Sequence, residues 1–177
     1  MEKRVVFDAN RLQATLDNLA GEIVNTFKTP DDVVLIGIRT RGVELAQRLQ
    51  KLVSDKYRQE IPMGIMDITL YRDDLSQLAS QPLVQPSRLP FDVSGKKIIL
   101  VDDVIFTGRT IRAALDQIVD FGRPGVVRLL VIVDRGWREY PIQPDFTGVK
   151  IDTTVQQIVQ VRLKEIDGED SVMLVTR

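Results

Sequence analysis

Strand-length apolar runs alternate with amphipathic segments through the middle of this chain, and this alternation limits the fold more than any other feature. Residues 33–38, 96–101 and 126–133 form nearly continuous apolar runs, which are typical of strands covered on both faces. Between them, apolar residues recur every three or four positions, as they do along one face of a helix. The alternation predicts an α/β fold: an open, mainly parallel, twisted sheet with helices on both faces.

The same patterns place the other elements. Helical spacing predicts three helices, over residues 12–27, 43–53 and 111–118. The remaining segments are expected to be a strand over 63–70, a long polar loop over 71–90 and a small C-terminal hairpin over 159–175. The 177 residues contain no linker-like segment, so we expect a single domain over residues 1–177.

Two amino acids, His and Cys, are absent from the sequence. Their absence excludes a Ser-His-Asp triad, a thiolate nucleophile and a zinc site built on thiolates. Any chemistry must therefore use carboxylates, hydroxyls, backbone amides, Lys and Arg, and these groups are compatible with an oxygen-liganded ion such as Mg²⁺. The formal net charge is −1, from 24 basic and 25 acidic residues, so an anionic ligand needs a locally built site.

The sequence shows no sign of membrane attachment. No apolar run approaches the ~20 residues needed to cross a bilayer, and the first residues lack the apolar core of a signal peptide. We expect a cytoplasmic protein without a membrane partner.

The segment IILVDDVIFTGRT joins a buried strand to an acidic pair and a turn of glycine and hydroxyl residues. Ligands of open α/β sheets bind beyond the carboxyl ends of the strands, and a helix N-terminus presents free N–H groups to an anion. Gly108 allows close approach of a phosphate, and the hydroxyls of Thr107 and Thr110 add donors. The pattern predicts a sugar-phosphate site, in which the turn holds phosphate and Asp102 and Asp103 hold ribose hydroxyls.

Three other interpretations of this segment are weaker. The acidic pair could cap the following helix and face water, but a cap requires one such side chain rather than two. A Walker A loop requires the pattern Gly-x4-Gly-Lys-Ser/Thr, which is absent. A phospho-acceptor receiver domain also has an acidic pair after an apolar strand, but near the start of its chain and without a glycine-hydroxyl turn.

VDDVIFTGRT resembles the phosphoribosyl-pyrophosphate motif of type I phosphoribosyltransferases. The wider pattern is similar to the PyrR family, regulators of pyrimidine operons that are also uracil phosphoribosyltransferases. Besides this motif, the resemblance includes the first helix and the blocks IGIRTRG, DITLYRDDL and DRGWREYPI, in that order over nearly the whole chain. It implies a type I phosphoribosyltransferase fold whose C-terminal hairpin forms a hood over the site.

The resemblance also implies residue roles. The turn of residues 39–42 would be a pyrophosphate loop, Arg72 would lie on a mobile lid that closes over pyrophosphate, and the segment near Arg135, with Val159, would hold the base. The catalytic residues expected are Asp102, Asp103 and Arg72. The expected substrate-binding residues are Arg39, Thr40, Arg41, Gly42, Val104, Ile105, Phe106, Thr107, Gly108, Arg109, Thr110, Arg135 and Val159.

The reaction implied by the resemblance is displacement of pyrophosphate from phosphoribosyl pyrophosphate by N1 of uracil, giving UMP. Mg²⁺ is the implied cofactor, carried by the pyrophosphate donor without direct ligands from the protein, and a homo-oligomer is expected. Two alternatives stay open: a phosphoribosyltransferase for another base without RNA regulation, and a non-catalytic RNA-binding regulator. Purine and orotate relatives share the core motif.

A second implied partner is the leader mRNA of pyrimidine operons, which PyrR proteins bind in response to UMP. RNA binding requires a clustered basic face. Four residues stand where the family carries basic or His residues: Asp17, Asn18, Gly21 and Gln143. Arg135 and Arg138 remain. We expect the transferase activity to be retained and RNA binding to be weakened or lost.

Overall fold

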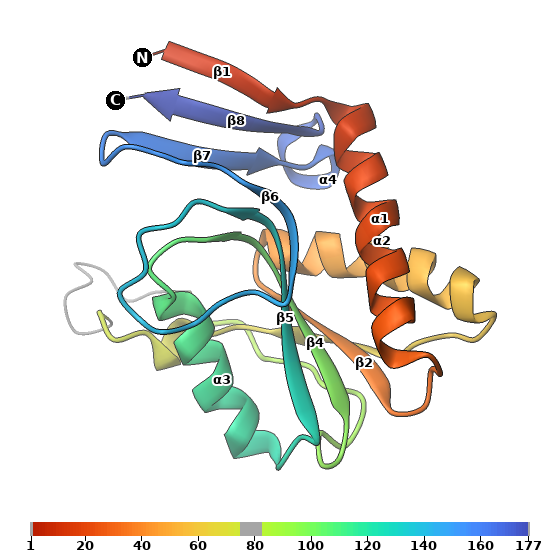
Figure 1. Cartoon of the computed structure of the whole chain (residues 1–177). Helices are drawn as coiled ribbons and strands as arrows, with labels where there is room; N and C mark the ends of the chain where they lie inside the picture. Colours follow the sequence, from red (N-terminus) through yellow and green to blue (C-terminus); the bar gives the residue numbers. More distant parts are fainter. Residues whose placement is uncertain (1, 75–82, 177) are drawn as a thin grey trace.

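The computed structural model describes residues 2–74 and 83–176. Its main sheet is parallel and has five strands in the order β3-β2-β4-β5-β6 (Figure 1). The strand bounds are Val33–Ile38 (β2), Met63–Met66 (β3), Lys97–Ile105 (β4), Val126–Asp134 (β5) and Phe146–Lys150 (β6). Every residue of β2 is buried, as expected of a central strand with helices over both faces.

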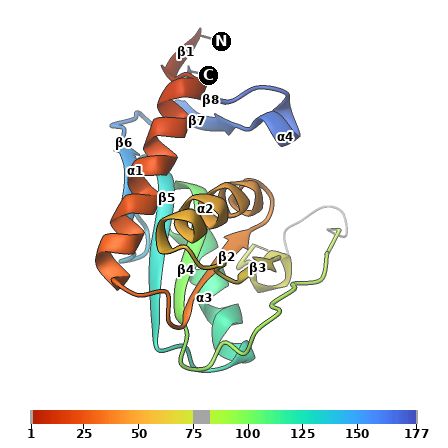
Figure 2. The ribbon, with the colours of Figure 1, turned by 90° about the vertical axis from the view of Figure 1, so that its right-hand side faces the viewer.

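Three helices cover this sheet. Helices α1 (Ala9–Phe27) and α2 (Arg41–Tyr57) pack on one face and α3 (Arg109–Phe121) on the other (Figures 1 and 2). Because successive strand residues point to opposite faces, Leu35 packs with α1 and α2 while Ile36 packs with α3. The predicted α/β fold, with its parallel sheet and two helical layers, is confirmed.

A smaller antiparallel sheet forms the second part of the molecule, above the main sheet in Figure 1. Its strands lie in the order β1-β8-β7. Their bounds are Glu2–Phe7 (β1), Ser171–Thr176 (β8) and Gln157–Arg162 (β7), and the short helix α4 (Lys164–Asp167) joins β7 to β8. We call β1, β7, α4 and β8 the hood. The predicted C-terminal hairpin is confirmed, and the N-terminal strand β1 completes it as a third strand.

Two strands end elsewhere than expected. The strand predicted over residues 63–70 stops at Met66, because the Asp67 carboxylate accepts the N–H of Thr69 at 2.9 Å and its hydroxyl at 2.5 Å. This turns the chain into a short 3-10 helix, η1 (Thr69–Tyr71). Strand β4 continues to Ile105 because its backbone pairing with β5 extends to that residue. The acidic pair therefore lies within β4 rather than after it.

Strands β1 and β6 were not expected from the sequence. The partner of β1 is β8, at the other end of the chain, and β6, with the sequence FTGVK, has no continuous apolar run. Of the predicted loop over residues 71–90, residues 75–82 lie outside the described part of the chain.

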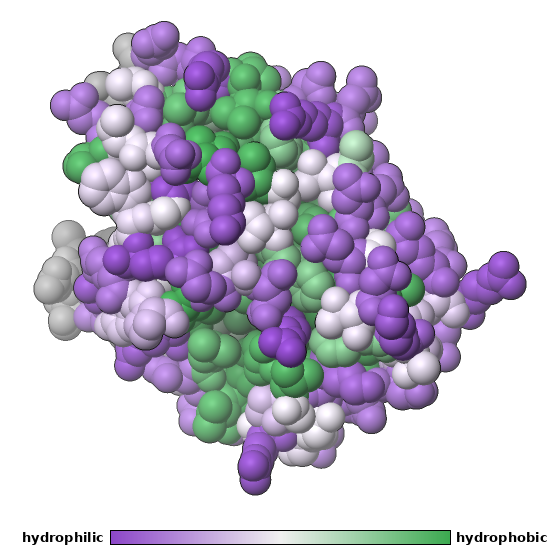
Figure 3. Space-filling model, in the orientation of Figure 1, coloured by the Kyte–Doolittle hydropathy of each residue, from purple (hydrophilic) through white to green (hydrophobic). Residues whose placement is uncertain are grey.

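The face shown in Figure 3 is mainly hydrophilic, with apolar patches at the level of the hood and at the level of α3. Within residues 2–74 and 83–176, no helix is long and apolar enough to cross a membrane.

Candidate active site

A cavity of about 460 Å³ lies between the hood and the main sheet. Three of the predicted site residues line it: Arg41 from the start of α2, Asp103 from β4 and Val159 from β7. The other lining residues are Lys3, Gln160, Val161, Arg162 and Asp167. Carboxylate and guanidinium groups from distant parts of the sequence thus face one space.

The acidic pair of β4 divides between two environments. Asp103 lines the cavity, whereas Asp102 is 8% exposed and is not among the cavity's lining residues. The Asp102 Oδ1 atom accepts the N–H of Asp103 at 2.9 Å, and Asp103 Oδ1 accepts the N–H of Val104 at 2.8 Å. The two side chains still lie close enough to interact with each other, and Asp103 is the one that lines the cavity.

Both carboxyl groups are hard to ionise where they lie. Burial and the adjacent Asp103 charge raise the pKa of Asp102 well above its usual range. Burial also raises the pKa of Asp103, although the N–H of Val104 and the charge of Arg41 oppose this shift. A nearby cation or a bound polar ligand would favour the ionised form of the pair.

The predicted pyrophosphate loop, residues 39–42, leads from β2 into α2. Thr40 precedes the first residue of the helix and is exposed, and the Arg39–Thr40 peptide bond is cis. A Cβ at Gly42 would lie 2.5 Å from the carbonyl oxygen of Val101 in β4. Only glycine therefore lets α2 begin this close to the strand that carries the acidic pair.

Arg39 and Arg41 lie differently within this loop. The Nε atom of Arg39 is buried without a hydrogen-bond partner among the described residues, and its charge helps to lower the pKa of Asp67. The Arg41 side chain is 35% exposed, lies on the cavity and pairs with Asp167. Of the two arginines, Arg41 is the one on the cavity.

The predicted phosphate turn connects β4 to α3. Val104 and Ile105 end the strand, and Phe106 is 42% exposed. Gly108 has φ +91°, a left-handed conformation that favours glycine. Gly108 precedes α3 and has no side chain that could cap the helix. Thr107 Oγ1 accepts the N–H of Arg109 at 3.3 Å. The first turn of α3 thus presents backbone N–H groups of the kind that bind phosphate.

Arg72, Arg109 and Thr110 line a second, smaller cavity of about 230 Å³. There Arg72 pairs with Asp74 at 2.7 Å, while Arg109 pairs with Asp73 and with Glu139. Arg72 is therefore not brought to the cavity that Asp103 lines. Its role on a lid over the pyrophosphate stays a prediction, and residues 75–82 of the same loop lie outside the described part of the chain.

Arg135 is buried and bridges the core to the hood. Its guanidinium lies 4.0 Å above the centre of the Phe106 ring, and its Nη2 donates to the carbonyl oxygen of Gln157 in β7 at 2.8 Å. Burial lowers the pKa of Arg135. The side chain thereby supports Val159, two residues further along β7, rather than lining the larger cavity itself.

The predictions from sequence did not include Lys3, Arg162 and Asp167 as cavity residues, or Asp67 as a residue that joins two backbone segments. The first three reach the cavity only because β1 pairs with β8 and β8 with β7. Asp67 holds both stems of the polar loop, since its carboxylate accepts the N–H groups of Thr69 and Gln85 at 2.9 Å and 2.8 Å. The motif DITLYRDDL contained this residue, but no pattern indicated its partner at Gln85.

The described residues contain no group of three or more carboxylates that could hold a metal ion by themselves. Asp103 does line the cavity. Mg²⁺ is usually bound through one or two carboxylates together with substrate phosphates and water. The side chains present therefore fit an Mg²⁺ ion that arrives with a polyphosphate ligand.

Comparison with known proteins gives a consistent family. The family model described as "Phosphoribosyl transferase domain" matches residues 6–166. A protein named "Bifunctional protein PyrR" from Pelotomaculum thermopropionicum is 50% identical, and the match covers 98% of this chain and 96% of the relative. The protein of the same name from Thermus aquaticus is 46% identical, with 97% and 95% covered.

Solved structures show the same fold at low sequence identity. The hypoxanthine phosphoribosyltransferase of Trypanosoma cruzi has a TM-score of 0.74 and 15% identity, with 98% of this chain and 96% of that chain covered. A hypoxanthine-guanine phosphoribosyltransferase of Bacillus anthracis has a TM-score of 0.73 and 15% identity, with both chains covered completely. These similarities concern the fold alone.

Proposed function

This chain belongs to the phosphoribosyl transferase family and, within it, to the PyrR family, and we propose that it makes UMP and pyrophosphate from uracil and phosphoribosyl pyrophosphate. The cavity between hood and sheet carries this proposal, because it combines the Asp103 carboxylate with the Arg41 guanidinium. These are the two charges that the reaction requires: one near a cationic sugar carbon and one near an anionic leaving group.

In this proposal the bond between C1 of ribose and a pyrophosphate oxygen breaks while a bond from C1 to N1 of uracil forms, and the N1 proton leaves with the departing pyrophosphate. Positive charge develops on the sugar ring, and a fixed carboxylate close to it stabilises the transition state. Asp103 supplies that carboxylate from the cavity wall, and the carboxylate of Asp102 accepts the backbone N–H of Asp103. Arg41 binds oxygens of the departing pyrophosphate through charge-assisted hydrogen bonds.

Other parts of the site bind and orient the substrates. The free N–H groups at the start of α3 hold the 5′-phosphate, and the β7 backbone near Val159 lies along the base. Mg²⁺, when bound with the donor, neutralises charge on the pyrophosphate. Arg72 acts from the lid. The protein works as one domain over residues 1–177, as a homo-oligomer in the cytoplasm.

A base panel tests this proposal directly. Uracil, cytosine, orotate, hypoxanthine and guanine are each incubated with labelled phosphoribosyl pyrophosphate and Mg²⁺, and the nucleotide formed is identified by chromatography. We expect UMP from uracil and little product from the other bases. Efficient transfer to a different base would establish the alternative phosphoribosyltransferase, and no transfer to any base would favour a non-catalytic regulator.

The name "Bifunctional protein PyrR" of the relatives raises a second function, regulation through pyrimidine-operon mRNA. In this chain the two retained arginines serve the fold instead. Arg135 is 8% exposed, and Arg138 pairs with Asp134 at 2.7 Å with its side chain 13% exposed. These contacts support our proposal that the transferase is the main activity and that RNA binding is weak.

A further inference from the structure

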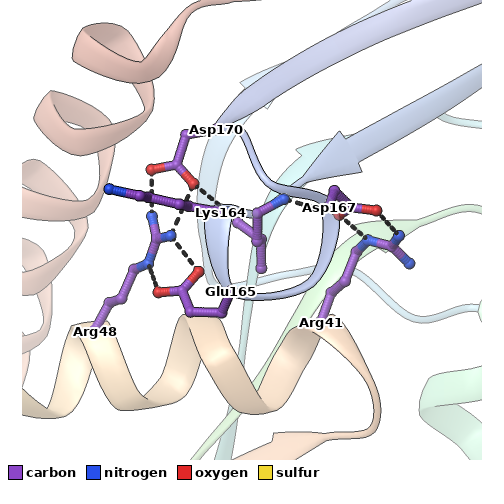
Figure 4. A network of polar contacts seen from close by, with 7 residues as sticks. Arg41, Arg48, Lys164, Glu165, Asp167 and Asp170 are labelled. Atoms are coloured by element: carbon purple, nitrogen blue, oxygen red, sulfur yellow. Dashed lines mark hydrogen bonds and ion pairs between the residues drawn. The ribbon is translucent and has the colours of Figure 1, made fainter.

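Two arginines on one side of α2 form ion pairs with the hood (Figure 4). Arg41, in the predicted pyrophosphate loop, donates from Nη2 to Asp167 Oδ1 at 2.8 Å and from Nε to Asp167 Oδ2 at 3.3 Å. Arg48, two turns further along α2, pairs with Glu165 at 2.5 Å and Asp170 at 2.8 Å. The two clusters differ in place: Arg41 and Asp167 line the large cavity, and Arg48, Glu165 and Asp170 do not.

Asp167 is itself held firmly. Its Oδ2 atom accepts the N–H of Leu163 at 2.9 Å, and its own N–H donates to the Leu163 carbonyl oxygen at 2.6 Å. Its side chain is 16% exposed, compared with 35% for Arg41. A fixed carboxylate therefore meets the longer and more exposed arginine side chain and determines where its guanidinium lies.

The geometry leaves donors of Arg41 available to a ligand. A guanidinium carries five N–H donors, and a carboxylate engages it most strongly along one edge. Asp167 occupies the edge formed by Nε and Nη2. The N–H groups of Nη1 make no hydrogen bond to the described residues, and they belong to a side chain on the cavity wall.

We propose that Asp167 is a positioning residue of the transfer reaction, which holds Arg41 so that the free edge of its guanidinium meets the pyrophosphate of the donor. The proposal rests on the function proposed above. Helix α4 begins two residues after the end of β7, whose backbone is expected to hold the base. Through Asp167, the hood that closes over the base also orients the cation that binds the leaving group.

If Asp167 acted through its charge alone, its removal would tighten pyrophosphate binding, because a negative charge would be lost from an anion site. Weaker binding in Asp167→Asn would therefore report that Arg41 has lost its orientation. Glu165→Gln is the matched control: it removes one carboxylate from the same helix and breaks an ion pair between the same two helices, away from the cavity. Asp167→Glu keeps the charge and tests rescue.

The experiment is titration calorimetry of inorganic pyrophosphate with Mg²⁺, together with KM and kcat for phosphoribosyl pyrophosphate. We expect pyrophosphate affinity to fall and the donor KM to rise about tenfold in Asp167→Asn, which is the size of one such contact. We expect a smaller change in kcat, partial recovery in Asp167→Glu and no change in Glu165→Gln.

Unchanged or tighter pyrophosphate binding in Asp167→Asn would overturn the proposal. An equal loss of affinity in Glu165→Gln would also overturn it, because both ion pairs would then only hold the hood against the core. If Asp167→Asn does not fold, Asp167→Glu decides by the same two measurements, since its longer side chain should shift Arg41 and weaken binding less than tenfold but measurably. The titration needs no turnover, so failure of the transferase assay in the unaltered protein would count against the proposed function and not against this inference.

Discussion

Two adjacent carboxyl groups on a buried strand are costly to ionise. Burial raises the pKa of both Asp102 and Asp103, whose side chains also interact with each other, and each carboxylate accepts a neighbouring backbone N–H. A group whose pKa is raised by folding binds protons more tightly in the folded than in the unfolded state. Such a group stabilises the fold below its unfolded pKa, and that stability is lost as pH rises through the folded pKa. Near neutral pH the pair therefore destabilises the fold.

Replacing both residues, Asp102→Asn with Asp103→Asn, should separate activity from stability. Without a carboxylate facing the developing cation, we expect transfer to fall by about 10²-fold or more. The same change should raise the melting temperature at pH 8 by a few degrees, since ~1 kcal/mol corresponds to about 2–4 °C in a chain of this size. The gain should be smaller at pH 5, because raised pKa values favour proton uptake by the folded carboxyl groups as the pH falls.

Steady-state assays and calorimetry at the two pH values measure both effects. Asp116→Asn is a suitable control, since Asp116 is an exposed acid paired with Arg112 on α3. A double variant with kcat near that of the unaltered protein would remove the acidic pair from the mechanism. A melting temperature that falls at pH 8 would contradict the raised pKa values.

Among single residues, the structure shows where the predicted site residues lie, while their roles stay predictions. Asp103, Arg41 and Val159 lie on the cavity, and Gly108 occupies the left-handed turn before α3. What could not be predicted depends on distant partners. Asp167 meets Arg41 across 126 positions of sequence, and Lys3 reaches the cavity from a strand that had no recognisable pattern.

Among the elements, the long polar loop is fixed at its two ends by one side chain. Asp67 is 8% exposed and binds the N–H and hydroxyl of Thr69 on one stem and the N–H of Gln85 on the other. Burial acts to raise the pKa of Asp67, but the hydrogen bonds from Thr69 and Gln85 outweigh it and lower the pKa. The stem that leads to Arg72 thus begins at an ionised, fully bonded carboxylate.

Asp67→Ala should release both stems. Loss of three hydrogen bonds to a charged group should destabilise the fold by about 2–4 kcal/mol. The donor KM should rise several-fold, because the stem that leads to Arg72 is released and Arg39 loses the nearby charge of Asp67. Asp67→Asn should fall between, since an amide oxygen can still bind Thr69. Urea unfolding and steady-state kinetics measure the two effects. Asp92→Ala, at an exposed turn where the carboxylate binds the N–H of Ser94, should leave the KM unchanged, and a normal KM in Asp67→Ala would exclude the anchoring role.

Elements with their own periodicity were predictable, and elements defined by pairing were not. The strands β2, β4 and β5 and the three long helices follow from local apolar patterns. Strand β6 contains Thr147 and Gly148, so its pattern is interrupted, and β1 is defined by its pairing with β8. The early end of β3 results from a hydrogen bond of Asp67, which the spacing of apolar residues does not indicate.

At the scale of the whole molecule, many of the basic residues form ion pairs with acidic residues of the same chain. The net charge is −1, and many arginines pair with carboxylates of this same chain. These are Arg41, Arg48, Arg72, Arg109, Arg112, Arg128, Arg138 and Arg162. The carboxylate of each pair offsets the charge of its arginine, so the pair contributes little to a positive potential that would attract an RNA backbone.

These charges lead to the prediction that the leader RNA of a pyrimidine operon binds this protein weakly. Asp17 and Asn18 are exposed on α1, and Gln143 is exposed near the end of the DRGWREYPI block. Filter-binding titrations at physiological salt, with and without UMP, should give dissociation constants of ~10⁻⁶ M or weaker, in the range of non-specific binding.

Asp17→Lys combined with Gln143→Arg should tighten binding and steepen its dependence on salt, because each added cation can release a counterion from the RNA. Transferase activity should not change in that variant, since neither residue lies on the cavity. Nanomolar binding by the unaltered protein, strengthened by UMP, would show that the remaining surface suffices for RNA and that the internal pairing of its arginines does not prevent regulation.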